Sequence, residues 1–307
     1  MKDDQVARVH ERLAARPELR PMAFGEGHRF GLWELASLAE GAFGECVDPD
    51  SLSVTGEKRW RLRLGAAGRE HGRTDDVRVR YWIRSPGSRG GRPIGTVAVD
   101  TCPVGVGAVR ITSLYVHPVA RRRGLASAVL DLVYDACRAE GLRGYRLDTY
   151  WTWQPAVRYY LRRGLWVTSW KHALGFARLS QLPRYEVEES GEGELTFLVT
   201  GEEGRPVPVL VAGSVGGRLW LRESEEYRGT PDRLDAVRLY ARSTLALHLA
   251  VRGRPLVRGE EERARSHPWC DIGEPEALAH RIADFEGVAR SRGWRVRSPY
   301  GGGLPAL

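Results

Sequence analysis

The sequence has little cysteine and methionine, and no apolar run long enough to cross a membrane. Its four cysteines are scattered, and none forms a CxxC pair, so neither a disulfide framework nor a zinc site is predicted. Residues 1–5 lack the features of a secretory signal. We therefore expect a cytoplasmic protein with reduced thiols, no membrane span and no bound metal.

Lysine is also scarce: only three of the 47 basic residues are lysine, and the rest are arginine. The formal net charge is +8, and residues 71–180 alone carry 18 basic against 7 acidic residues. Such a segment suits a ligand with several phosphates, an acidic substrate or nucleic acid. Because GC-rich coding also produces an arginine bias, the charge is weak support for a nucleic-acid partner, and we expect none.

Hydrophobic periodicity predicts an alternation of helices and strands, which is an α/β layout with a mixed sheet. Helices are expected at 3–15, 30–43, 125–140 and 155–163, and strands at 60–64, 77–84, 94–100, 109–116, 145–150 and 165–178, the last with a break near 172.

A compositional boundary follows, because residues 186–203 contain seven glutamates and no basic residue. We predict an N-terminal helical segment at 1–70, an α/β core at 71–184, and an additional α+β region at 185–307. This last region should contain strands at 195–200, 207–213 and 218–222 and helices at 232–250 and 275–292. It could shape acceptor specificity, form a homodimer or bind a carrier or peptide.

The most informative stretch is 111–126, in which an apolar run leads to Pro118, three arginines, Gly124 and small residues. Apolar residues at 129, 132, 133 and 136 then lie on one helical face. A strand that ends in a loop at a helix N-terminus is a phosphate-binding arrangement, because the first amides of a helix lack partners and its dipole is positive there. Gly124 and Ala126 would allow a ligand to approach closely.

The pattern Arg121-x-x-Gly124-x-Ala126 resembles the acyl-CoA-binding motif of the GNAT (Gcn5-related N-acetyltransferase) superfamily. The resemblance continues to Ala156-x-x-x-Tyr160-x-x-x-Gly164-Leu165, similar to the second family signature, and spans about residues 71–180. It implies the GNAT fold, in which the strands at 109–116 and 145–150 would splay apart to admit pantetheine. The helical segment at 1–70 would then be part of the acyltransferase domain, with the helix at 30–43 covering one side of the acceptor site. It further implies that acetyl-CoA or another acyl-CoA contacts Leu114, Tyr115, Val116, Arg121, Arg122, Arg123, Gly124, Leu125, Ala126 and Ser127.

The resemblance also implies catalytic roles. Tyr160 occupies the position of the general acid that protonates the departing thiolate, unless it only packs against the ligand. Asp148 is the preferred general base, with Asp100 and His117 as alternatives; His117, at an exposed turn, is expected to be solvated. Trp153 stands where the family often has Asn, so contact with the pantetheine arm is in question.

Two further groups of residues could belong to a site. The aromatic residues Trp33, Tyr150, Trp151, Trp153, Trp166 and Trp170 could surround a cationic or apolar acceptor, or could equally form core. Residues 267–271 offer only three potential metal ligands and are expected to form a structural turn.

The predicted function is acyl-CoA-dependent N-acyltransfer, most simply from acetyl-CoA to a primary amine of a small molecule such as an antibiotic, amino sugar or polyamine. Acylation of a peptide or protein amine is the first alternative. The second is a CoA-binding regulatory protein without turnover, suggested by Trp153 and by the absence of a carboxylate in 109–116.

Overall fold

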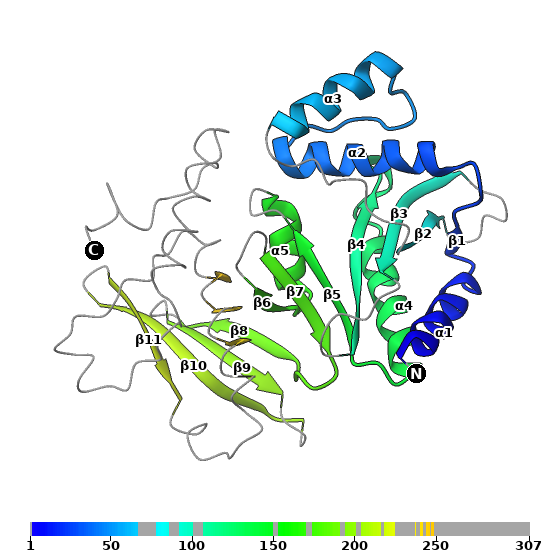
Figure 1. Ribbon diagram of the computed structural model, residues 1–307. Helices are drawn as coiled ribbons and strands as arrows, with labels where there is room; N and C mark the ends of the chain where they lie inside the picture. The colour runs from blue at the N-terminus through cyan, green and yellow to red at the C-terminus, as the bar shows by residue number, and fades with distance from the viewer. Residues whose placement is uncertain are drawn as a thin grey trace. The chain divides into compact units, whose positions relative to one another are not determined.

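The computed structural model describes residues 2–66, 78–85, 92–100, 107–149, 153–169, 174–190, 194–200, 204–215 and 218–224, with Val237, Tyr240, Ala241, Thr244, Leu245, Leu247 and His248. Helices alternate with strands in parallel and antiparallel pairs, which confirms the predicted α/β class with a mixed sheet (Figure 1). The chain divides into two compact units, Met1–Trp153 with Ala177–Gln181, and Gln154–Phe176 with Leu182–Leu307.

The sheet of the first unit has the strand order β1-β2-β3-β4-β5, followed by the second half of β7. Neighbours from β1 to β4 are antiparallel, whereas β4 and β5 are parallel. The strands are β1 (Leu19–Pro21), β2 (Arg78–Arg84), β3 (Pro93–Asp100), β4 (Ala108–Val116), β5 (Gly144–Thr149) and β7 (Leu174–Leu179).

Helices cover both faces of this sheet. The Tyr81 hydroxyl bonds His10 of α1 at 2.8 Å, while the next residue, Trp82, packs on Phe30 of α2 with ring centroids 5.0 Å apart. Because successive side chains of a strand point to opposite faces, α1 and α2 lie on opposite sides. Glu140, just after α4, forms ion pairs with Arg8 and Arg12 of α1. The helices are α1 (Lys2–Ala14), α2 (Gly27–Phe43), α3 (Val54–Ala66), the 3₁₀ turn η1 (Pro118–Ala120) and α4 (Leu125–Ala139).

The strand predicted at 60–64 is wrong, because these residues belong to α3. Alternating apolar and charged residues imitated a strand over this short window. Helical spacing brings Glu57 to Arg61 in an i,i+4 ion pair and turns Leu64 into a core with Leu35 and Ala42. Tertiary burial and the longer helical period therefore override the local alternation.

The second unit contains α5 and a four-stranded antiparallel sheet of order β11-β10-β9-β8. Its core includes Trp166, Tyr185 and Phe197, whose ring centroids lie 4.8–5.4 Å apart. The predicted break near 172 is confirmed as two strands, β6 and β7. The remaining elements are α5 (Gln154–Arg162), β6 (Trp166–Ser169), β8 (Tyr185–Glu189), β9 (Leu195–Thr200), β10 (Pro206–Val215) and β11 (Arg218–Glu223).

Two strands, β1 and β8, were not predicted. β1 has three residues and ends in proline, so no period is visible in it. β8 is an edge strand whose glutamates are exposed, and charge on an edge strand prevents unwanted pairing. The predicted helix at 232–250 is described at seven positions between 237 and 248, all helical, and the helix at 275–292 lies outside the described residues.

Candidate functional site

Strands β4 and β5 run side by side only at their starts. Parallel pairing joins residues 108–111 to residues 144–147 and, within the described parts of both strands, goes no further, although β4 continues to Val116. A register shift against β3 leaves Thr112 as an extra residue in β4. A bulge of this kind bends a strand and increases its twist. The two strands therefore diverge, as Figure 1 shows.

The backbone of β4 directs hydrogen-bonding groups into this divergence. The N–H of His117 donates to the carbonyl of Ile94 at 2.9 Å, on the β3 side. Because antiparallel pairing uses alternate residues, the groups of Leu114 and Val116 point to the opposite side, toward β5. The Tyr115 side chain is buried against Trp33, and burial raises the pKa of its phenol.

A loop follows β4 and leads into α4. Gly124 is the N-cap residue with φ +76° and ψ 0°, and no side chain caps the helix. The first helical hydrogen bond runs from Ala128 N–H to Gly124 O, so the amides of 125–127 precede it. A Cβ added at Gly124 would meet nothing within 4 Å. The loop thus presents helix-start amides beside open space, a suitable place for a phosphate group.

The three arginines of the loop have different surroundings. Arg122 and Arg123 are exposed, and Arg122 has a positive φ of 62°. Arg121 is half-buried, and its guanidinium bonds both carboxylate oxygens of Glu40 in α2, each at 2.6 Å. Its Nε also donates to the Val116 carbonyl at 2.8 Å.

The candidate bases lie in different environments. Asp148, on β5 just past the last paired residue, is ion-paired to Arg110 at 2.7 Å and has 41% of its side chain exposed. Asp100, at the end of β3, is opposite Arg78. His117 is more enclosed than predicted, with 21% of its side chain exposed, and its Nε2 lies 3.7 Å from Asp48 Oδ1.

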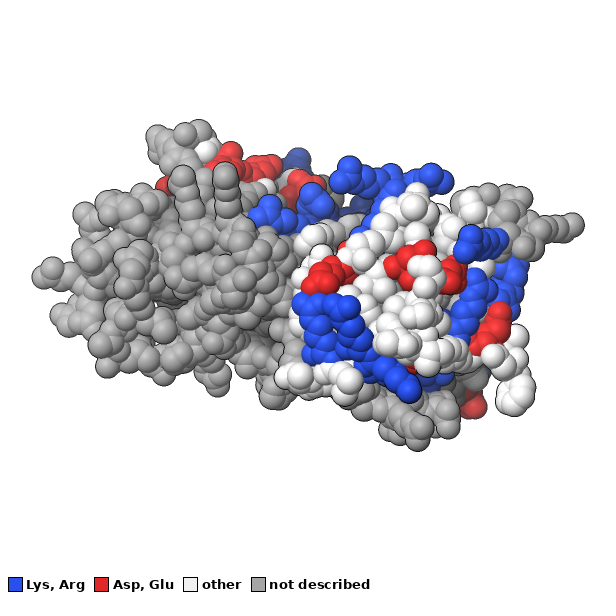
Figure 2. Space-filling model, turned by 90° about the horizontal axis from the view of Figure 1, so that it is seen from above, with Lys and Arg blue, Asp and Glu red and all other residues white. Residues whose placement is uncertain are grey.

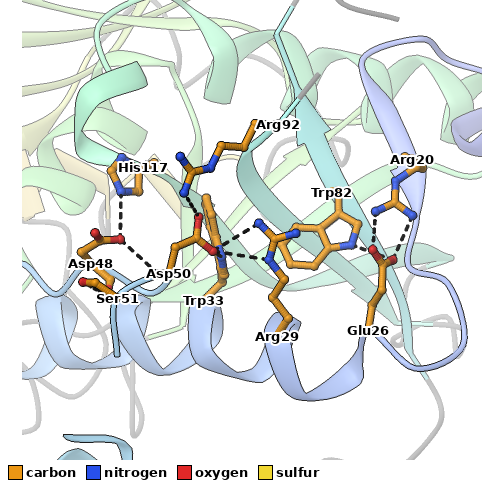
Figure 3. A network of polar contacts seen from close by, with 10 residues as sticks. All are labelled: Arg20, Glu26, Arg29, Trp33, Asp48, Asp50, Ser51, Trp82, Arg92 and His117. Atoms are coloured by element: carbon orange, nitrogen blue, oxygen red, sulfur yellow. Dashed lines mark hydrogen bonds and ion pairs between the residues drawn. The ribbon is translucent and has the colours of Figure 1, made fainter. Parts of the chain in front are cut away.

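A polar network holds α2 and the loop after it against the sheet (Figure 3). Asp50 accepts hydrogen bonds from Trp33, Arg29 and Arg92 at 3.0–3.4 Å. Although burial opposes it, these donors lower the pKa of Asp50. The side chains in Figure 3 point toward one another, so α2 is fixed in position beside the end of β4.

Glu26 holds the start of α2 against the sheet in a similar way. It accepts hydrogen bonds from Arg20, from the Ala23 N–H and from Trp82. Led by the Arg20 contact, these bonds lower the pKa of Glu26 to about 2. Glu26 is therefore a carboxylate at neutral pH and anchors α2 to β1 and β2.

Glu34 and Arg78 form an enclosed pair that sequence reasoning missed. They lie 3.2 Å apart, with 17% and 9% of their side chains exposed. Burial raises the pKa of Glu34 despite the opposing charges of Arg78 and Arg80. The pair brings α2 and β2 together from 44 residues apart, a separation at which the sequence offers no local signal.

Tyr160 lies in the second unit. It is buried, and its ring is 5.2 Å from Phe176 and 5.4 Å from Tyr159. Burial raises the pKa of Tyr160, so the phenol keeps its proton at neutral pH. This state is the one that a proton donor requires.

Only some of the aromatic residues that could surround an acceptor lie in the described part of the chain. Trp33 and Trp166 are core residues, with 1% and 2% exposure, so for these two the core alternative holds. Trp153 is partly exposed. Tyr150, Trp151, Trp170 and the turn at 267–271 lie outside the described residues.

Charge on the described surface is mixed. In the view from above (Figure 2), Lys and Arg side chains form separate groups with Asp and Glu side chains between them. Among the residues placed by the structure, no three His, Cys, Asp or Glu side chains are grouped as a metal site would require. No helix in the same part of the chain is both long and apolar enough to cross a membrane.

Residues 48–165 match the family model described as "Acetyltransferase (GNAT) family". These residues form a GNAT domain. The match begins earlier and ends earlier than the stretch of 71–180 expected from the motifs, and it includes α3, the β4 loop, β5 and Tyr160. The α2 helix, with Glu40, precedes it.

No curated protein matches the chain. Similar solved structures include the PaiA N-acetyltransferase of Thermoplasma acidophilum in complex with coenzyme A, with 10% identity, 52% of this chain and 96% of that chain covered, and a TM-score of 0.36. A GNAT acetyltransferase of Staphylococcus aureus Mu50 has 13% identity, coverages of 53% and 99%, and a TM-score of 0.35. The GNAT domain of PAT from S. lividans has 17% identity, coverages of 52% and 87%, and a TM-score of 0.33.

Proposed function

We propose that the protein transfers an acyl group, most simply acetyl from acetyl-CoA, to a primary amine of a small molecule. The observation that supports the proposal is that two features lie at the same end of β4. One is the divergence of β4 from β5, and the other is the start of α4 at Gly124, which no side chain caps. A ligand with phosphates at one end and a chain of amides behind them is complementary to both features.

In this proposal the GNAT domain holds acyl-CoA through its backbone. The amides of Leu125, Ala126 and Ser127, at the start of α4, receive the pyrophosphate, with Arg122 and Arg123 supplying exposed positive charge. The Leu114 main-chain groups and the Val116 N–H pair with the pantetheine amides, in place of the β5 partners that the divergence removes, while the Val116 carbonyl accepts from Arg121. Tyr115 supports the strand instead of the ligand, because its side chain is core and its main-chain groups face β3.

The chemistry then needs three events. The amine nitrogen attacks the thioester carbonyl, the new C–N bond forms as the C–S bond breaks, and the sulfur takes a proton while the nitrogen loses one. Tyr160 is the proposed donor to sulfur because its phenol carries a proton at neutral pH; the raised pKa makes it a weak acid, so the donation relies on its position beside the thiolate. Asp148 is the proposed acceptor of the amine proton, in competition with Arg110, which already occupies the carboxylate at 2.7 Å. Positioning both reactants supplies much of the rate.

The loop between α2 and α3 is held by several polar contacts, and this favours a small acceptor. Asp50 is bonded to Arg29, Trp33 and Arg92, and Asp48 lies beside His117 at the end of β4. A loop held in this way restricts the approach to the end of β4. The exposed Asp48 carboxylate adds negative charge, which attracts a protonated amine.

The test is release of free thiol from acetyl-CoA with a panel of acceptors: polyamines, amino sugars, aminoglycoside antibiotics and lysine-containing peptides. We expect turnover with at least one small amine and none with the peptides. Turnover with peptides alone would replace the small-molecule acceptor with a protein amine. Tight binding of acetyl-CoA without turnover on any amine, and without slow hydrolysis, would contradict the enzymatic function in favour of a CoA-binding regulator.

A further inference from the structure

The contacts of Arg121 fix it in place. Three of its N–H groups are engaged, two with the Glu40 carboxylate and one with the Val116 carbonyl, at 2.6–2.8 Å. Its guanidinium also lies 5.4 Å from the Tyr115 ring centroid. Glu40 is itself enclosed, with 13% of its side chain exposed. Bidentate, charge-assisted bonds of this kind are strong and geometrically specific.

We call the contacts of Arg121 with Glu40 and with the Val116 carbonyl the clasp. The clasp joins α2 and the end of β4 to the phosphate loop, which is the segment 117–124 between β4 and α4. Val116 is the last residue of β4, and Arg121 is three residues before Gly124. The residues between Arg121 and the helix include Arg122 and Gly124, both with positive φ. Backbone of this kind persists only where the surrounding structure holds it. Arg121 supplies that restraint from one side of the loop.

We infer that Glu40 and Arg121 are positioning residues for the acyl donor: Arg121 shapes the loop through Glu40 and Val116 instead of serving as a phosphate ligand. The inference rests on the proposed function. It assigns a role to Glu40, in a helix upstream of the GNAT domain match, and it connects α2 with the loop. Helix α2 is therefore held at two places: Asp50 and Glu26 hold its N-terminal part, and Glu40, near its C-terminal end, connects it to the donor site.

The direction in which Glu40→Gln changes the affinity for acyl-CoA distinguishes a positioning role from a purely electrostatic effect. Removing a carboxylate near a polyanionic ligand reduces repulsion, so charge alone predicts tighter acyl-CoA binding. A phosphate-ligand role for Arg121 predicts the same, because Arg121 would be released toward the ligand. Loss of the clasp predicts weaker binding, since the loop must then be ordered by the ligand itself.

The experiment is a double-mutant cycle of Glu40→Gln and Arg121→Gln, with acetyl-CoA dissociation constants measured by calorimetry on the full chain. We expect each variant to raise the dissociation constant about tenfold, and the double variant to be no weaker than either single one, because the two residues act as a unit. The KM for acetyl-CoA should rise in parallel, while kcat at saturating donor changes less than about twofold.

Glu45→Gln is the matched control, because Glu45 lies just after the same helix and forms its ion pair with Arg63 of α3, at 2.6 Å. Its dissociation constant should equal that of the wild type. Glu40→Asp serves if Glu40→Gln does not fold: it keeps the charge but shortens the reach, so the clasp predicts weaker binding. Equal or tighter binding by the Glu40 variants, or additive losses in the cycle, would overturn the inference. Failure of the wild type to bind would instead overturn the proposed function, and the inference with it.

Discussion

Replacing Gly124 by alanine tests whether the left-handed backbone of the loop is required for donor binding. The φ of +76° is in a region that residues with a Cβ enter at a cost of about 1–2 kcal/mol. Crowding adds nothing, because a Cβ would meet no atom within 4 Å. The cost is therefore conformational. If the free loop relaxes and must be strained again on binding, the dissociation constant for acetyl-CoA should rise about 5- to 30-fold.

The controls separate strain from position and charge. Gly107 has φ +72° and equally open surroundings but precedes β4, so Gly107→Ala should lower the free energy of unfolding similarly without changing the dissociation constant. Gly124→Asn should bind better than Gly124→Ala, because Asn tolerates the left-handed region. Gly124→Glu should abolish binding by placing a carboxylate beside the phosphates. Calorimetry with all four variants is the assay, and wild-type affinity in both Gly124→Ala and Gly124→Glu would refute the loop assignment.

Three further predictions concern other parts of the chain. Tyr160→Phe should lower turnover more than donor affinity, with Tyr159→Phe as control; unchanged turnover would limit Tyr160 to packing. Burial lowers the pKa of His10 from 6.5 to about 4, so between these two pH values the unfolded chain binds a proton that the folded chain does not. The free energy of unfolding should therefore be constant above pH 6.5, fall by up to about 3 kcal/mol as the pH drops from 6.5 to 4, and level off below 4. Urea midpoints of wild type and His10→Gln should then converge at low pH, and parallel curves would contradict a lowered pKa of His10. Gly144→Ala places a Cβ 2.1 Å from the Arg178 carbonyl at φ +139°, so urea unfolding should show a loss of about 3 kcal/mol or more.

Much of the first unit could be predicted because its signals are local. The strand to Val116, the turn at Pro118 and the helix after Gly124 follow one another in sequence, and each has its own period or punctuation. The structure confirms these elements within one or two residues. Its divergence of β4 from β5 was expected only through the family resemblance, and the bulge at Thr112 supplies its physical reason.

The contacts that give the site its shape could not be predicted. Glu40 and Arg121 are 81 residues apart, and although the motif draws attention to Arg121, nothing in the sequence indicates that Glu40 is its partner. Aromatic composition was equally uninformative: Trp33 is core in the structure, and nothing in its local sequence separates a core tryptophan from one that lines a pocket. Long-range pairing and burial are properties of the fold, so short patterns do not carry them.

Donor binding in this protein depends, in our proposal, on the loop at Gly124, which holds the phosphates of an acyl-CoA. Titration of the purified protein with acetyl-CoA in a calorimeter, beside Gly124→Glu, tests it most directly. We expect saturable micromolar binding by the wild type and none by the variant. Absence of binding to the wild type, or equal binding by both proteins, would contradict it.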